Sequence, residues 1–112
     1  MGMQAHIRTK SIIEYEPQPF CNTDCIELKD YLERNDILLN EMYNDSDYQP
    51  NWEINRTALI NNIVEIKGKP QNEFVFNDTT YGDLVNIFTN WIDITSHKEN
   101  YSDNSIINID WL

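Results

Sequence analysis

Basic residues and long apolar runs are what this sequence has least of. Eight Lys and Arg residues stand against nineteen Asp and Glu, for a net charge of −11. No apolar run approaches the roughly 20 residues that a membrane-spanning helix needs. The first ten residues, MGMQAHIRTK, contain no apolar region typical of a secretory signal. We therefore expect a cytoplasmic protein that does not insert into membranes.

Cysteine and glycine are also scarce, with two and three residues. Cys21 and Cys25 are too few for a disulfide framework, and no second pair of Cys or His residues completes a zinc site. We expect two reduced cysteines, one of them buried. The sequence contains no glycine-rich phosphate loop and neither of the catalytic motifs G-x-S-x-G and H-E-x-x-H. Its two histidines, His6 and His97, are isolated from each other and from any such motif. The sequence predicts no enzyme, no cofactor and no metal site.

The negative charge is concentrated in two blocks. Residues 24–53 carry a net charge of −7 and residues 73–112 carry −6, whereas residues 1–20 are neutral and residues 56–69 carry +2. A negative surface repels nucleic acid phosphates and attracts basic protein surfaces. The charge therefore disfavours direct binding of nucleic acid and indicates a basic protein partner.

The clearest structural element is the stretch DTTYGDLVNIFTNWI, residues 78–92. Its apolar residues recur at the spacing of one helix face, and Thr79 or Thr80 is placed to cap the amino end. Asp83 follows in the first turn, where the helix dipole favours a negative charge. This spacing predicts a helix over about 79–92 that covers a sheet.

A second helix is predicted over about 24–34. Asp24 and Glu27 have the spacing of a capping box. The apolar side of this helix is formed by four residues, Cys25, Leu28, Tyr31 and Leu32. Acidic residues recur every three positions on the other side, at Asp24, Glu27, Asp30 and Glu33. After Asp36 the pattern fits either a continued helix through Met42 or a short strand.

Strands are predicted at both ends of the chain. Residues 4–16 alternate and read as one strand that stops before Pro17 and Pro19, because proline cannot donate to a sheet ladder. Residues 17–22 are then a connection, and residues 43–51 are a loop by composition. The β-branched stretch of residues 105–112 predicts a closing strand, which as an exposed edge could mediate association.

Residues 52–77 fit two descriptions. The preferred one is three strands, residues 52–60, 63–67 and 73–77, with a hairpin turn at Asn61-Asn62. The competing one is a helix over 56–67 that ends at Gly68. Phe74–Phe76 is a strand in both. The predicted class is α+β, one domain over residues 1–112, with a mostly antiparallel sheet of four to five strands and two helices (about 24–34 and 79–92) packed on it.

Acidic residues interleaved with aromatic ones form the candidate site. Interface centres favour Trp and Tyr, and acidic rims speed association with basic partners. Trp52 and Trp111 are expected in the core. Asp45 and Asp47 resemble the start of a calcium loop, but the glycine and closing glutamate of that motif are missing. The predicted partner-binding residues are Asp30, Glu33, Asp36, Glu41, Tyr43, Asp45, Asp47, Tyr48 and Glu53.

Three functions fit this pattern. The leading hypothesis is a bacterial immunity protein, an antitoxin-like inhibitor that occupies the cationic cleft of a nuclease or RNase toxin. The second is a phage-type DNA mimic, whose carboxylates imitate phosphates and block a DNA-binding enzyme. The third is a small enzyme, which would need two carboxylates and a histidine in one pocket. The sequence leaves the oligomeric state open.

Overall fold

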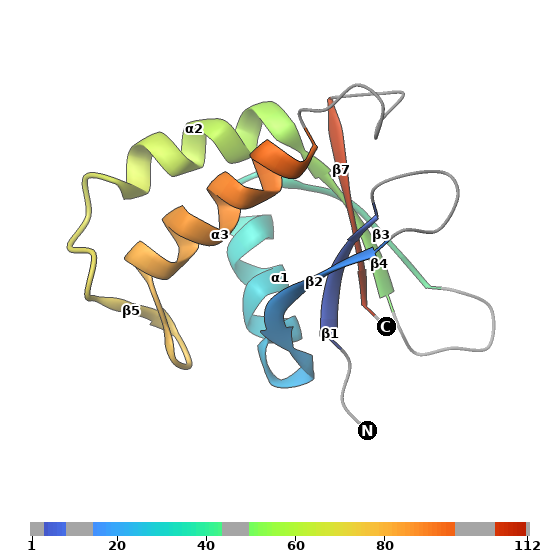
Figure 1. Ribbon diagram of the computed structural model, residues 1–112, viewed down its shortest axis with the longest axis horizontal. Helices are drawn as coiled ribbons and strands as arrows, with labels where there is room; N and C mark the ends of the chain where they lie inside the picture. Colours follow the sequence, from blue (N-terminus) through green and yellow to red (C-terminus); the bar gives the residue numbers. More distant parts are fainter. Residues whose placement is uncertain (1–3, 9–14, 44–49, 96–104, 112) are drawn as a thin grey trace.

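The computed structural model describes residues 4–8, 15–43, 50–95 and 105–111. Five strands form an antiparallel sheet with the order β2-β1-β7-β4-β3. Their bounds are Gln4–Arg8 for β1, Tyr15–Cys21 for β2, Leu38–Tyr43 for β3, Pro50–Asn55 for β4 and Ile106–Trp111 for β7. A short hairpin pairs β5, Phe74–Phe76, with β6, Thr79–Thr80. The helical segments are η1, Asn22–Asp24, then α1, Cys25–Arg34, α2, Arg56–Ile66, and α3, Tyr81–Ile94. The predicted α+β class is confirmed (Figure 1).

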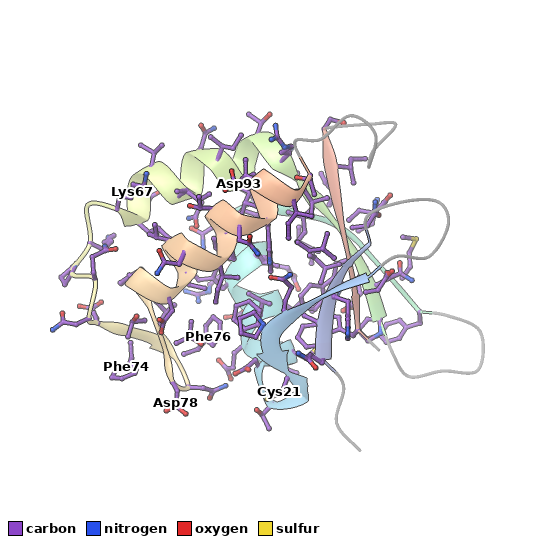
Figure 2. The ribbon with its side chains drawn as sticks, viewed as in Figure 1. Cys21, Lys67, Phe74, Phe76, Asp78 and Asp93 are labelled. Atoms are coloured by element: carbon purple, nitrogen blue, oxygen red, sulfur yellow. The ribbon has the colours of Figure 1, made fainter. Side chains whose placement is uncertain are left out.

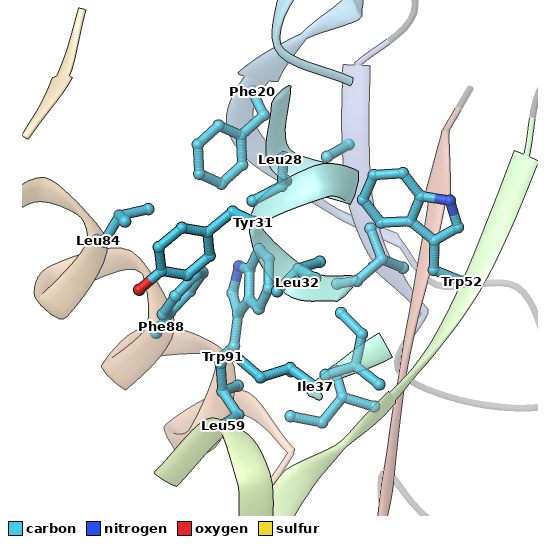
Figure 3. Close-up of a cluster of buried hydrophobic side chains, with 14 of the residues drawn as sticks. Phe20, Leu28, Tyr31, Leu32, Ile37, Trp52, Leu59, Leu84, Phe88 and Trp91 are labelled. Atoms are coloured by element: carbon cyan, nitrogen blue, oxygen red, sulfur yellow. The ribbon is translucent and has the colours of Figure 1, made fainter. Parts of the chain in front are cut away.

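The core lies between the sheet and the helices. Alternate residues of β4 and β7 point inward, so that Trp52 pairs with Ile109 and Ile54 with Ile107, all four fully buried. Leu28 and Leu32 of α1 meet Phe88 and Trp91 of α3 in the same cluster (Figure 3). Trp52 and Trp111 lie in this core as predicted, with ring centroids 5.2 Å apart in an edge-on arrangement.

Helices α1 and α3 confirm the two predicted helices. At the start of α3, the Thr80 hydroxyl accepts a hydrogen bond from the Asp83 backbone N–H at 3.1 Å, and the Asp83 carboxylate accepts one from the Thr80 N–H at 3.0 Å. This reciprocal pair is a capping box. The capping box predicted for α1 is wrong. The Asp24 side chain caps nothing in α1 and accepts hydrogen bonds from Cys21 and Asn77 instead.

The preferred prediction for residues 52–67 is wrong beyond residue 55, because α2 replaces the second half of the strand predicted over 52–60 and the strand predicted over 63–67. Asn55 caps this helix by accepting a hydrogen bond from the Ala58 N–H at 3.0 Å. Leu59, Ile63 and Ile66 recur at helical spacing and are buried. Burial of that face outweighs the strand preference of the β-branched residues, since propensity is weaker than tertiary packing. The competing prediction of a helix that ends at Gly68 is confirmed, as is the strand Phe74–Phe76.

The predicted single strand over residues 4–16 is wrong, because β1 and β2 are separate strands that pair antiparallel. Pro17 and Pro19 lie inside β2, so the predicted connection over 17–22 is wrong in its first five residues. β2 is an edge strand that pairs with β1 alone, with a register shift between Gln4 and His6. Proline is tolerated at such edges and bulges because its missing N–H need not face a neighbour.

Two further predictions are settled by the sheet. The closing strand is confirmed as β7, but it lies between β1 and β4, so its predicted role as an exposed edge is wrong. The choice left open after Asp36 resolves to the strand β3, and Asp36 itself takes a left-handed backbone with φ of 56°. Most of the predicted loop over 43–51 lies outside the described residues.

The buried thiol of Cys25 should make the protein sensitive to alkali. Burial raises the pKa of this thiol from 9.0 to about 11, with the Glu41 carboxylate as a second cause. The folded state therefore keeps a proton that the unfolded state loses. The free energy of unfolding should fall by about 2 kcal/mol as the pH rises from about 9 to 11. Burial also raises the pKa of Tyr31, which adds to the fall at the upper end.

Urea unfolding under reducing conditions between pH 8 and pH 11 measures this effect. Cys25→Ala should flatten the profile, whereas Cys21→Ala, at an exposed cysteine, should keep it. A profile that is equally steep in Cys25→Ala would assign the alkaline loss to other groups.

Candidate functional site

The predicted partner-binding residues fall into separate groups in the structure. Asp45, Asp47 and Tyr48 lie outside the described residues, as does the calcium-like stretch. Asp30 and Glu33 are exposed on α1, and Asp36 is exposed in the turn that follows. The remaining three, Glu41, Tyr43 and Glu53, belong to β3 and β4.

Glu41 is part of the packing between α1 and the sheet. Its carboxylate lies 2.8 Å from the Lys29 ammonium and accepts a hydrogen bond from the Trp52 indole N–H, also at 2.8 Å. Its side chain is only 16% exposed. The hydrogen bond to Glu41 raises the pKa of Lys29. Two partners already occupy this carboxylate, so it serves the fold more than an interface.

Glu53 lies on the opposite face of the sheet. It alternates with Trp52 and Ile54, which point into the core, so its own side chain points outward. There it accepts a hydrogen bond from the Asn40 side chain at 2.9 Å and pairs in register with Asn108. The structure therefore does not bring Glu53 together with Asp30 and Glu33, and the predicted site divides between two faces.

A pocket that the sequence did not predict lies beside the start of α1. Its volume is about 480 Å³, and three carboxylates, those of Asp24, Asp78 and Asp83, line it together with the exposed Cys21. Figure 2 shows Cys21 and Asp78 at two neighbouring tips of the molecule. The Asn77 side chain donates to the Asp24 carboxylate at 2.8 Å, and this bond ties the β5–β6 turn to η1.

The sequence contained the parts of this pocket but not their proximity. Asp24 and Asp83 each stood at a predicted helix start, and Asp78 stood just before one. They are brought together by the turn at Asn77, whose φ of 47° is left-handed. Asn takes this conformation more readily than most residues. An Asn-Asp pair directly after the strand Phe74–Phe76 is the one local signal that indicated such a turn.

We use the name acidic ridge for the acids that line this pocket together with those of α1 and of the turn after it. Its members are Asp24, Glu27, Asp30, Glu33, Asp36, Asp78 and Asp83. Helix α1 also carries two bases, and both form ion pairs with carboxylates. Arg34 lies 3.0 Å from Asp30, and Lys29 lies 3.6 Å from Glu33 and 2.8 Å from Glu41. The ridge thus presents a net negative charge to solvent.

Comparison with known proteins returns no relative. No family model, no curated protein and no solved structure matches this chain. The case for function therefore rests on the geometry alone. Within the described ranges, no three His, Cys, Asp or Glu side chains are grouped to hold a metal ion, and no helix is long and apolar enough to cross a membrane.

Proposed function

We propose that this protein is an acidic inhibitor that binds a basic protein partner, in the manner of a bacterial immunity protein. Its target would be a nuclease or RNase toxin of the cytoplasm, with the acidic ridge seated in the toxin's cationic cleft. The observation that carries this proposal is the ridge itself. The ridge has seven acids, three of which line one pocket, and the only two bases of α1 are already paired with carboxylates.

The physical basis is substitution of carboxylates for phosphates. An enzyme that cuts nucleic acid binds the phosphate backbone with clustered Lys and Arg. Carboxylates held on a helix and a hairpin would pair with those cations and exclude the substrate. Such complementary charge speeds association and makes it sensitive to salt. Asp30 and Glu33 are exposed enough to reach a partner, with side chains 62% and 55% exposed.

A DNA mimic is the second candidate, and the acids of α1 at intervals of three residues favour it. Such a mimic needs carboxylates spread regularly over an extended face. Helix α1 has ten residues and is therefore about 15 Å long, less than half of the roughly 34 Å of one DNA turn. Of the other ridge acids, Asp24, Asp78 and Asp83 line the pocket at the start of α1. This compact shape favours a protein cleft over an imitation of duplex DNA.

Titration of a toxin's activity tests the proposal. The candidate toxin is the product of the reading frame beside this gene, assayed on a labelled nucleic acid substrate. Added in increasing amounts, this protein should abolish the activity at a molar ratio of one to one, and a complex should co-elute at low salt. Full activity at a tenfold excess, with the protein eluting alone, would exclude inhibition of that toxin.

A further inference from the structure

The two edges of the main sheet differ in how they are protected. β2 carries Pro17 and Pro19, which block pairing with another chain. β3, with the sequence LLNEMY, has neither proline nor lysine. It also exposes apolar side chains: Leu39, Met42 and Tyr43 are 46%, 43% and 60% exposed. An edge that is unprotected and partly apolar is suited to accept a further strand.

β3 is an edge strand of the sheet that the described residues form. It pairs with β4, and no other described strand lies beside it. A register shift between Leu38 and Asn40 interrupts the pairing near Leu39, but Asn40 to Tyr43 are in regular antiparallel register with residues 50–53. Alternate residues of such a strand direct their N–H and C=O groups away from the sheet.

The surroundings of β3 are acidic on both faces of the sheet. Glu41 lies on the helix side, where Glu33 shares the same Lys29 ammonium, and Glu53 lies on the outer side beside Asn40. A strand added at this edge would therefore meet Glu53 on the outer side and, on the helix side, two carboxylates that share a single ammonium. Basic side chains at successive positions would match both faces, because neighbouring residues of a strand point to opposite sides.

We propose that β3 accepts an extended basic segment of the partner as a sixth strand, next to the acidic ridge. This inference rests on the proposed function and specifies its binding mode. A second copy of this chain is the poorer occupant, because pairing β3 with itself would join two surfaces of a protein with a net charge of −11. The incoming strand supplies main-chain hydrogen bonds, and its basic side chains supply selectivity.

A synthetic peptide tests the inference without an identified partner. The probe is an eight-residue peptide of the repeating sequence Lys-Lys-Val-Val, which presents lysines on both faces of an extended strand. Its control is the same peptide methylated on every backbone nitrogen, which keeps the charge and removes the donors. With ¹⁵N-labelled protein at low salt, amide shifts and slowed hydrogen exchange should concentrate at residues 39–43. The methylated peptide should bind at least about tenfold more weakly, since several hydrogen bonds of about 1 kcal/mol are lost.

Two results would overturn the inference. Equal binding of both peptides, with shifts confined to α1 and the turn after it, would remove β3 from the interface while leaving the acidic ridge in place. Binding of neither peptide would also remove it. Neither result bears on inhibition, which the toxin titration measures separately, so the two proposals can fail independently.

Discussion

Replacing Trp91 with alanine should destabilise the protein by about 3–5 kcal/mol, the range for deleting a large aromatic side chain from a core. A domain of this size has a total stability of about 5–15 kcal/mol. The variant is therefore expected to be partly unfolded near 37 °C. Unfolding in urea, followed by far-ultraviolet circular dichroism, measures the loss.

The magnitude follows from the position of Trp91 at the centre of the core. It is fully buried on α3, with its ring edge-on to Phe20 at 6.1 Å and beside Phe88 at 5.0 Å. Its indole N–H donates to the Gln18 side chain at 2.8 Å, which links α3 to the edge strand β2. Alanine would leave a cavity and remove this bond together with both ring contacts (Figure 3).

Asn90→Ala is the matched control, because Asn90 is exposed and adjacent on the same helix. That variant should stay within about 0.5 kcal/mol of the parent protein. A loss below about 1 kcal/mol in Trp91→Ala would contradict this description of the core.

The second large effect should come from reversing charge on the acidic ridge. The double variant Asp30→Lys/Glu33→Lys should weaken binding to the basic partner by about 100-fold, since charge of the right sign accelerates association by about 10 to 1,000-fold. Folding should change little, because both side chains are exposed and their ion pairs with Arg34 and Lys29 are at the surface. Isothermal titration calorimetry with the partner measures the change.

The matched control reverses two acids elsewhere. Glu73 precedes β5 and Asp93 lies on α3, both exposed and neither in the acidic ridge. Glu73→Lys/Asp93→Lys changes the net charge by the same amount as the ridge variant. If the partner contacts the acidic ridge, this control should keep an affinity for the partner within about threefold of the parent value. Equal losses in both variants would show that total charge, and not the ridge, determines binding.

The helices show which parts of the fold the sequence could predict. In α3 the apolar spacing and the Thr80–Asp83 cap agree, so local signals were sufficient. In α2 the local signals conflict, because the apolar spacing fits a helix whereas Asn61-Asn62 resembles a hairpin turn. Asn62 is instead buried and accepts a hydrogen bond from the Tyr31 hydroxyl at 2.8 Å. That partner is 31 residues away, and no local pattern indicates it.

The candidate site, like the helices, could be predicted only where local signals are sufficient. Asp30 and Glu33 were predicted because one helix presents them, and the structure leaves both exposed. Glu41 could not be recognised as half-buried and paired, because its partners Lys29 and Trp52 come from two other elements. Asp24 and Asp78 are 54 positions apart, and the turn at Asn77 alone brings them to one pocket. The sequence therefore placed Asp30 and Glu33 on an exposed helix side, whereas tertiary contacts determine where Glu41, Asp24 and Asp78 lie.

The association rate at increasing ionic strength tests the role of the acidic ridge most directly. Stopped-flow mixing of the parent protein with the proposed toxin should show a rate that falls at least about tenfold between 20 and 500 mM NaCl. The ridge variant Asp30→Lys/Glu33→Lys should start slower and depend less on salt, and the control variant should follow the parent. A parent rate that does not change with salt would contradict recognition through the acidic ridge.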